Sequence, residues 1–164
     1  MRARQAGIGI TLFFVLAVLA TATAGPRGHY DRAAPADKAF VDVVLDLEQA
    51  IGQHNFAITA RNEIGQAIRQ RGHADFGDAT IVHFCNLEYA RRVIAIDPDL
   101  ILYMPCRIAV FDKGTRVHVA SWLLPTDTHE AQFNALAGEI NTHIRAIVDA
   151  AVVPIVAPAN PPQD

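Results

Sequence analysis

Two cysteines, and the side chain two positions before each of them, are the residues of this chain best suited to chemistry. His83 stands two residues before Cys85. Met104 stands two residues before Cys106 in the same way. If both pairs lie in strands, each pair points to one face of a sheet. Thiolate, thioether and imidazole together suit copper(I), or an axial position on haem. These four residues are therefore our metal or ligand candidates, provided that the two pairs face each other.

The two cysteines allow plainer interpretations as well. If the strands that carry Cys85 and Cys106 are neighbours, the thiols lie near each other and can form a disulfide. Such a bond would stabilise the fold by roughly 3 kcal/mol in the chain-entropy model. Both residues can instead be reduced, buried thiols that pack as small apolar side chains. The sequence has no CxxC and no CxxCH motif, so it predicts neither a thioredoxin-like activity nor covalently attached haem.

Arg107 follows the second cysteine and should point to the opposite face of its strand. An arginine in a strand can hold an anion or a carboxylate ligand through two parallel hydrogen bonds, so it is our anion-binding candidate. The alternative, which we prefer on the sequence alone, is a structural ion pair with one of three acidic residues: Glu63, Glu88 or Asp112.

Other enzyme chemistry finds no support in the sequence. There is no GxSxG motif, no HExxH motif and no glycine-rich loop that could cradle a phosphate. Ser121 is the only serine, and no catalytic residue is predicted. His118 and Trp122 share a strand face, and Trp122 can line a ligand cleft or fill the gap between sheet and helix. His143 lies beside the apolar stripe of a long helix and is expected at a partly exposed boundary.

The N-terminal segment has the pattern of an export signal. Arg2 and Arg4 precede an uncharged, mostly apolar run over residues 6–20, and Ala22-Thr23-Ala24 is a small-x-small cleavage pattern. We expect residues 1–24 to be a signal peptide and the protein to be periplasmic or secreted, without stable membrane insertion after cleavage. An uncleaved anchor is the alternative. The net charge of −3 and the lack of a basic stripe argue against nucleic acid as a partner.

The rest of the chain is expected to fold as one α+β domain over residues 37–151, between a flexible leader at 25–36 and a proline-rich, disordered tail at 152–164. Apolar periodicity and turn signals predict helices at 37–51, 63–71, 87–95 and from about 131 to 151, and strands at 56–60, 79–85, 100–104, 107–112 and 116–123. Asp127 and Glu130 resemble a capping box before the last helix. This order favours a single, mostly antiparallel sheet of four to five strands, packed against an N-terminal helix and a long C-terminal helix.

Four short segments of the chain carry a recognisable pattern: His54-Asn55-Phe56, Phe84-Cys85-Asn86 with Ala90, Asp97-Pro98, and Met104 to Val110. In these segments the chain resembles a bacterial family catalogued as domain of unknown function 302. The resemblance implies a curved antiparallel sheet packed on helices and a tendency to form homodimers. It implies no established activity, although exported members are found near periplasmic sulfur or redox systems. Asn55 stands where a glycine would be expected, and asparagine tolerates the left-handed conformation.

We therefore expect an exported small binding or accessory protein of unknown ligand, linked to periplasmic sulfur or redox metabolism through a redox partner or a small ligand. The first alternative is a thiol- or metal-dependent redox protein that holds copper or haem on the two-cysteine face. The second alternative is a structural dimeric scaffold.

Overall fold

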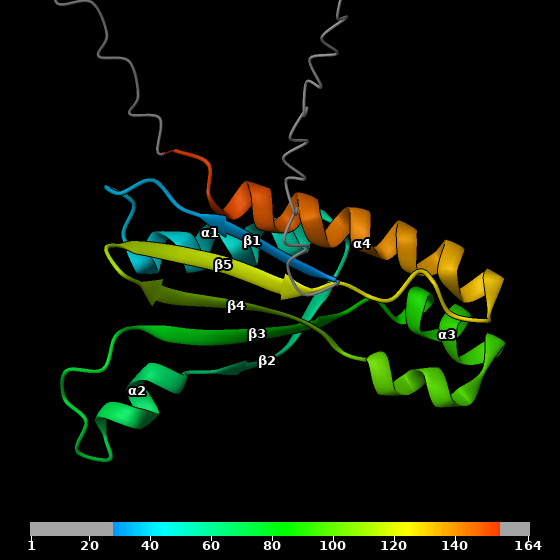
Figure 1. Ribbon diagram of the computed structural model, residues 1–164, viewed down its shortest axis with the longest axis horizontal. Helices are drawn as coiled ribbons and strands as arrows, with labels where there is room; N and C mark the ends of the chain where they lie inside the picture. Colours follow the sequence, from blue (N-terminus) through cyan, green and yellow to red (C-terminus); the bar gives the residue numbers. More distant parts are fainter. Residues whose placement is uncertain (1–27, 155–164) are drawn as a thin grey trace, which may run out of the picture.

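The computed structural model describes residues 28–154, which form a five-stranded antiparallel sheet with helices (Figure 1). The strand order is β1-β5-β4-β3-β2. The strands are β1 (His29–Ala33), β2 (Ala57–Asn62), β3 (Ala79–Cys85), β4 (Cys106–Lys113) and β5 (Arg116–Trp122). The helices are α1 (Phe40–Gln53), α2 (Ile64–Arg69), α3 (Leu87–Ile96), the 3-10 helix η1 (Pro98–Tyr103) and α4 (Ala131–Ala151). The expected α+β fold is confirmed.

Helices α1 and α4 pack against each other and against the sheet, as their apolar stripes predict (Figure 1). Both stripes are buried, and they meet the inward side chains of the central strands. From α1 these are Val43, Val44, Leu47, Ala50 and Ile51, and from α4 they are Phe133, Leu136, Ala137, Ile140, Ile144, Ile147, Val148 and Ala151. Burial of this apolar area is the main force that holds the helices to the sheet.

The register of β3 against β4 decides which side chains share a face. Phe84 lies opposite Cys106, and His83 lies opposite Arg107. Residues directly opposite in antiparallel strands point to the same side of the sheet. Cys106 therefore faces the helices together with buried Phe84, whereas His83 and Arg107 share the other side of the sheet.

The predicted flexible leader is wrong for residues 29–33, which form the edge strand β1. Its register on β5 runs from His29 opposite Trp122 to Ala33 opposite His118. The hydroxyl of Tyr30 donates to both carboxylate oxygens of Asp149 on α4, at 2.8 and 2.9 Å. Pairing with β5 and contact with α4 fix a segment whose glycines, prolines and alanines show no periodicity. The predicted signal peptide at 1–24 and tail residues 155–164 lie outside the described residues.

Residues 98–103 form the 3-10 helix η1, so the predicted strand at 100–104 is wrong. Asp97 caps η1 by accepting from the backbone N–H of Asp99, and Pro98 stands at the first helical position. These two signals override the alternating apolar residues that suggested a strand. The predicted capping box is also wrong, because Glu130 is the N-cap of α4 and its side chain forms no capping bond.

Two local predictions from the sequence are confirmed. Asn86 caps α3 by accepting from the backbone N–H groups of Glu88 and Tyr89. Asn55, two residues after the end of α1, has a φ of 61° and so adopts the left-handed conformation. Together α3 and η1 lie at one end of the sheet and α2 lies at the other (Figure 1). None of the helices described between residues 28 and 154 is long and apolar enough to cross a membrane.

Candidate functional site

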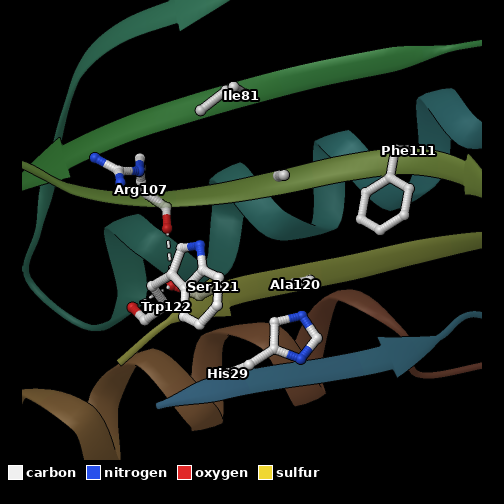
Figure 2. A pocket seen from close by; sticks show the side chains of 8 residues that line it. His29, Ile81, Arg107, Phe111, Ala120, Ser121 and Trp122 are labelled. Atoms are coloured by element: carbon white, nitrogen blue, oxygen red, sulfur yellow. Dashed lines mark hydrogen bonds between the residues drawn. The ribbon is translucent and has the colours of Figure 1, made fainter. Parts of the chain in front are cut away.

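A shallow cleft lies on the side of the sheet that faces away from α1 and α4. Its floor contains Ala109 of β4 and Ala120 of β5, which lie directly opposite each other. Larger side chains rise around these two alanines, and the resulting cleft has a volume of about 280 Å³. The lining residues come from four strands: His29, Ile81, Arg107, Ala109, Phe111, Ala120, Ser121 and Trp122 (Figure 2). Two small residues in register on neighbouring strands thus create the depression.

Aromatic rings form opposite parts of the cleft wall. The indole of Trp122 is 54% exposed and packs beside the imidazole of His29, with ring centroids 5.5 Å apart (Figure 2). Phe111 lies further along β4, with its ring 5.9 Å from that of His118. These rings offer flat apolar surfaces to a ligand. The exposed position of Trp122 also answers the question left open by the sequence, because its ring lines a cleft.

Arg107 supplies the cleft with a positive charge that no acidic side chain neutralises among residues 28–154. Its backbone carbonyl accepts from the hydroxyl of Ser121 at 2.8 Å, which fixes the backbone at the cleft edge (Figure 2). The ion pair that we preferred from the sequence is wrong, because the three acidic candidates have other partners. Glu63 pairs with Arg61, Glu88 pairs with Arg91, and Asp112 accepts from the backbone N–H of Asp78. The guanidinium of Arg107 is thus available to an anion.

A second, smaller cavity lies between the helices and the end of the sheet that holds both cysteines. Cys85, Met104 and Cys106 all line it. Its volume is about 30 Å³, roughly the share of liquid volume that one water molecule takes. Four rings close it off: Phe56, Tyr89, Tyr103 and Phe133. We call this space the sulfur cavity.

Both cysteines carry free thiols in this structure. Burial, and then the neighbouring charge of Cys85, raise the pKa of Cys106 to about 11. Burial also raises the pKa of Cys85. The thiolate, not the thiol, is the nucleophile and the metal ligand. At neutral pH the two residues are therefore protonated and unreactive unless a soft metal ion displaces their protons.

His83 does not join Cys106 and Met104. The pairing of β3 with β4 places His83 opposite Arg107, on the side of the sheet away from the sulfur cavity. The four-residue metal site predicted from the sequence is therefore not assembled, because strand alternation places the side chain of Cys85 with His83 on one side of the sheet, whereas Cys106 faces the helices. In the part of the chain that the structure describes, no three residues among His, Cys, Asp and Glu are placed to hold a metal ion.

A chain of polar side chains that the sequence did not reveal links three helices beside the sulfur cavity. The Nδ1 atoms of His54 and His143 lie 3.0 Å apart, and Nε2 of His143 lies 3.1 Å from the hydroxyl of Tyr89. The Tyr89 hydroxyl in turn donates to Glu139 at 2.7 Å. Burial, and then the charge of His143, lower the pKa of His54. The sequence analysis named His143 as a boundary residue and His54 only within the family likeness, because the three segments that carry the four residues lie far apart in the chain.

The residues of the cleft floor were also missed at the level of sequence. Ala109 and Ala120 are small residues at outward positions of strands whose inward positions hold Ile108, Val110 and Val119. That contrast in size was visible in the sequence, but the register that places the two alanines opposite each other was not.

Comparison with known proteins agrees with this architecture. The profile of the family described as "Domain of unknown function DUF302" matches residues 32–151. The chain belongs to the DUF302 family. No match to a curated protein was found.

A solved DUF302 structure shares the fold. It is described as the crystal structure of an uncharacterized conserved protein DUF302 from Bacillus stearothermophilus. The similarity has a TM-score of 0.69 at 17% sequence identity, and it covers 77% of this chain and 99% of that one. At this identity the likeness establishes the fold of the DUF302 domain and leaves the ligand open.

Proposed function

We propose that this DUF302 protein is an exported, non-enzymatic binding or accessory module, and that its ligand is a small acid with a flat apolar body. The observation that carries the proposal is an arginine without an acidic partner beside an aromatic-walled cleft. The ligand's carboxylate or other anionic group binds Arg107 through parallel hydrogen bonds. Its apolar body lies on Ala109 and Ala120 and packs against Trp122.

The size of the cleft limits the ligand. Pockets for drug-sized ligands usually measure about 300–1,000 Å³, and this cleft, at about 280 Å³, lies just below that range. A ligand with one ring, or a short branched chain, fits better than a nucleotide. The one hydroxyl among the lining side chains, that of Ser121, already donates to the carbonyl of Arg107. The cleft therefore favours binding over nucleophilic catalysis.

Export, and a role near periplasmic sulfur or redox metabolism, belong to the same proposal. They are supported by the signal-like pattern of residues 1–24 and by the family resemblance. We further propose that the protein forms homodimers. The supporting observation is a group of exposed apolar side chains on η1, of which Leu102 is the most exposed at 85%.

Fluorescence of Trp122 provides a direct test of the cleft, because this residue is the only tryptophan of the chain. Purified protein is titrated with benzoate and, as a neutral probe of the same shape, with benzamide. We expect benzoate to change the emission of Trp122 and benzamide to bind more weakly.

Arg107→Gln should weaken benzoate binding by about 10- to 100-fold, since a hydrogen bond to a charged group contributes roughly 1.5–3 kcal/mol. Arg71→Gln is the matched control, because Arg71 is exposed and its guanidinium contacts only the carbonyl of Ala67. Equal affinity of the wild type and Arg107→Gln for benzoate, or equal affinity of the wild type for acid and amide, would contradict the proposal.

A further inference from the structure

We propose that the ligand of the cleft carries two anionic groups, one bound by Arg107 and the other by His83. This proposal rests on the proposed function, and it narrows the ligand from a small acid to a dianion. The register of the sheet places His83 of β3 directly opposite Arg107 of β4. Side chains at directly opposite positions of antiparallel strands point to the same side, and their Cβ atoms lie about 4.5–5.5 Å apart.

His83 borders the cleft on the side of β3. Ile81 and Ala109 line the cleft and lie opposite each other. His83 and Arg107 form the next outward pair along the two strands, because residues two apart in a strand share a face. Figure 2 shows the side chain of Arg107 extending from β4 towards β3. Two side chains that can carry positive charge therefore stand on neighbouring strands at one end of the cleft.

No carboxylate competes for this pair on the open side of the sheet. At the strand positions that face this side within residues 28–154, Asp31 of β1 is the only acidic residue, and its Oδ1 atom lies 2.9 Å from Nδ1 of His118. The residue opposite His83 on β2 is Ala60, which is small and uncharged. On β3 itself the next residue on this side is Cys85, whose pKa burial raises, so that its thiol is neutral. An anionic group of the ligand can therefore bind His83 without displacing an internal ion pair.

The spacing of the two side chains suggests the geometry of the ligand. Cβ atoms about 5 Å apart suit two carboxylates held on one ring. Isophthalate, which has carboxylates at positions 1 and 3 of a benzene ring, is therefore the probe, and benzoate is the same ring with one carboxylate. The cleft, at about 280 Å³, has room for that ring above Ile81 and Ala109.

Calorimetric titration of purified protein with the two probes tests the second anionic group. At pH 6 we expect isophthalate to bind about 5-fold more tightly than benzoate, the ratio that one partly exposed ion pair provides. The preference should shrink at pH 8 and the same ionic strength, because an imidazole loses its positive charge over this range. Both probes stay ionised at the two pH values, since carboxylic acids titrate at about pH 4.

His83→Val removes the imidazole and keeps a residue that favours strands. This variant should lose both the preference for isophthalate and its dependence on pH. His129→Val is the matched control, because the side chain of His129 is 89% exposed in the segment before α4. It should retain the preference of the wild type.

The outcomes separate this proposal from the proposed function. Equal affinity of the wild type for the two probes at pH 6 overturns the second anionic group, while binding of benzoate at Arg107 still stands. A His83→Val variant that keeps the preference overturns the role of the imidazole. If neither probe binds to the wild type, the proposed function fails and this proposal fails with it.

Discussion

At the scale of single residues, His54 and His143 show how tertiary contacts set the chemistry of a side chain. Glu139 can only accept a hydrogen bond, so the Tyr89 hydroxyl donates to it, at 2.7 Å. The oxygen of Tyr89 is then free to accept from Nε2–H of His143. Nδ1 of His143 is left as an acceptor for Nδ1–H of His54. The chain is complete only when Nδ1 of His143 carries no proton and can accept this hydrogen bond.

This arrangement predicts a loss of stability in mild acid. Burial and the charge of His143 lower the pKa of His54 below 6.5 in the folded protein. The unfolded chain therefore takes up this proton at a higher pH than the folded protein does. The stabilising contribution is fully present above pH 6.5 and is lost as the pH falls below that value, towards the folded pKa. The groups that face the pair are Tyr89, Glu139 and, beyond them, Arg92.

Urea unfolding between pH 7.5 and pH 5 measures this effect. We expect the free energy of unfolding of the wild type to fall over this range, and His54→Gln to show a weaker dependence on pH. His73→Gln serves as the control, because His73 lies exposed in the loop after α2. The same pH dependence in His54→Gln and the wild type would show that the lowered pKa does not affect stability.

At the scale of elements, Lys38 fastens the end of α4 to the start of α1. Its side chain is almost fully buried, and Nζ donates to the carbonyls of Ala151 and Val153 at 3.0 and 2.7 Å. It also pairs with Asp46 of α1. The last carbonyls of a helix lack partners within the helix and attract positive charge. Lys38 thus satisfies the C-terminal end of the longest helix.

Lys38→Met should destabilise the protein by about 1–3 kcal/mol, the usual cost of leaving buried polar groups without a partner. Lys113→Met is the control, because Lys113 is exposed and lies 3.9 Å from Asp31. Exposed pairs of this kind contribute about 0–1 kcal/mol. Chemical denaturation of both variants gives the comparison, and similar losses in the two would argue against a special role for Lys38.

At the scale of the whole molecule, the helices cover the side of the sheet that packs into the core and leave the cleft on the other. The exposed apolar side chains of η1, including Leu102 and Tyr103, adjoin Trp122 across a small depression of about 120 Å³. Exposed apolar groups that cluster in this way are typical of association surfaces. We therefore place the proposed homodimer contact at η1.

Leu102→Asp should shift the protein from dimer to monomer in sedimentation experiments, because a charge in an apolar contact is costly to bury. Leu87→Asp is a close control, since Leu87 is 82% exposed on α3 and Leu102 is 85% exposed on η1. A monomeric wild type at all concentrations tested, or a dimeric Leu102→Asp, would rule out this contact.

The sequence by itself determined the elements whose signals are local. The stripes of α1 and α4, the alternation of β3 and β5, and the cap at Asn86 each depend on residues close in the chain. These signals predicted the α+β fold. They failed where a contact between distant segments decides the outcome. Strand β1 forms because it pairs with β5 and because Tyr30 donates a hydrogen bond to Asp149. The 3-10 helix η1 forms in place of a predicted strand, because the Asp97 cap outweighs the alternating apolar pattern.

Only the tertiary structure decided which candidate residues act together. A shift of one residue in strand register moves a side chain to the other face of the sheet. The observed register separates His83 from Cys106 and brings Ala109 opposite Ala120. Likewise, Glu63 and Glu88 form ion pairs with Arg61 and Arg91 and not with Arg107. These long-range and local contacts leave the guanidinium of Arg107 able to bind an anion. The sequence supplied the chemical groups, and long-range packing chose their partners, because that choice depends on distances between segments that local patterns do not encode.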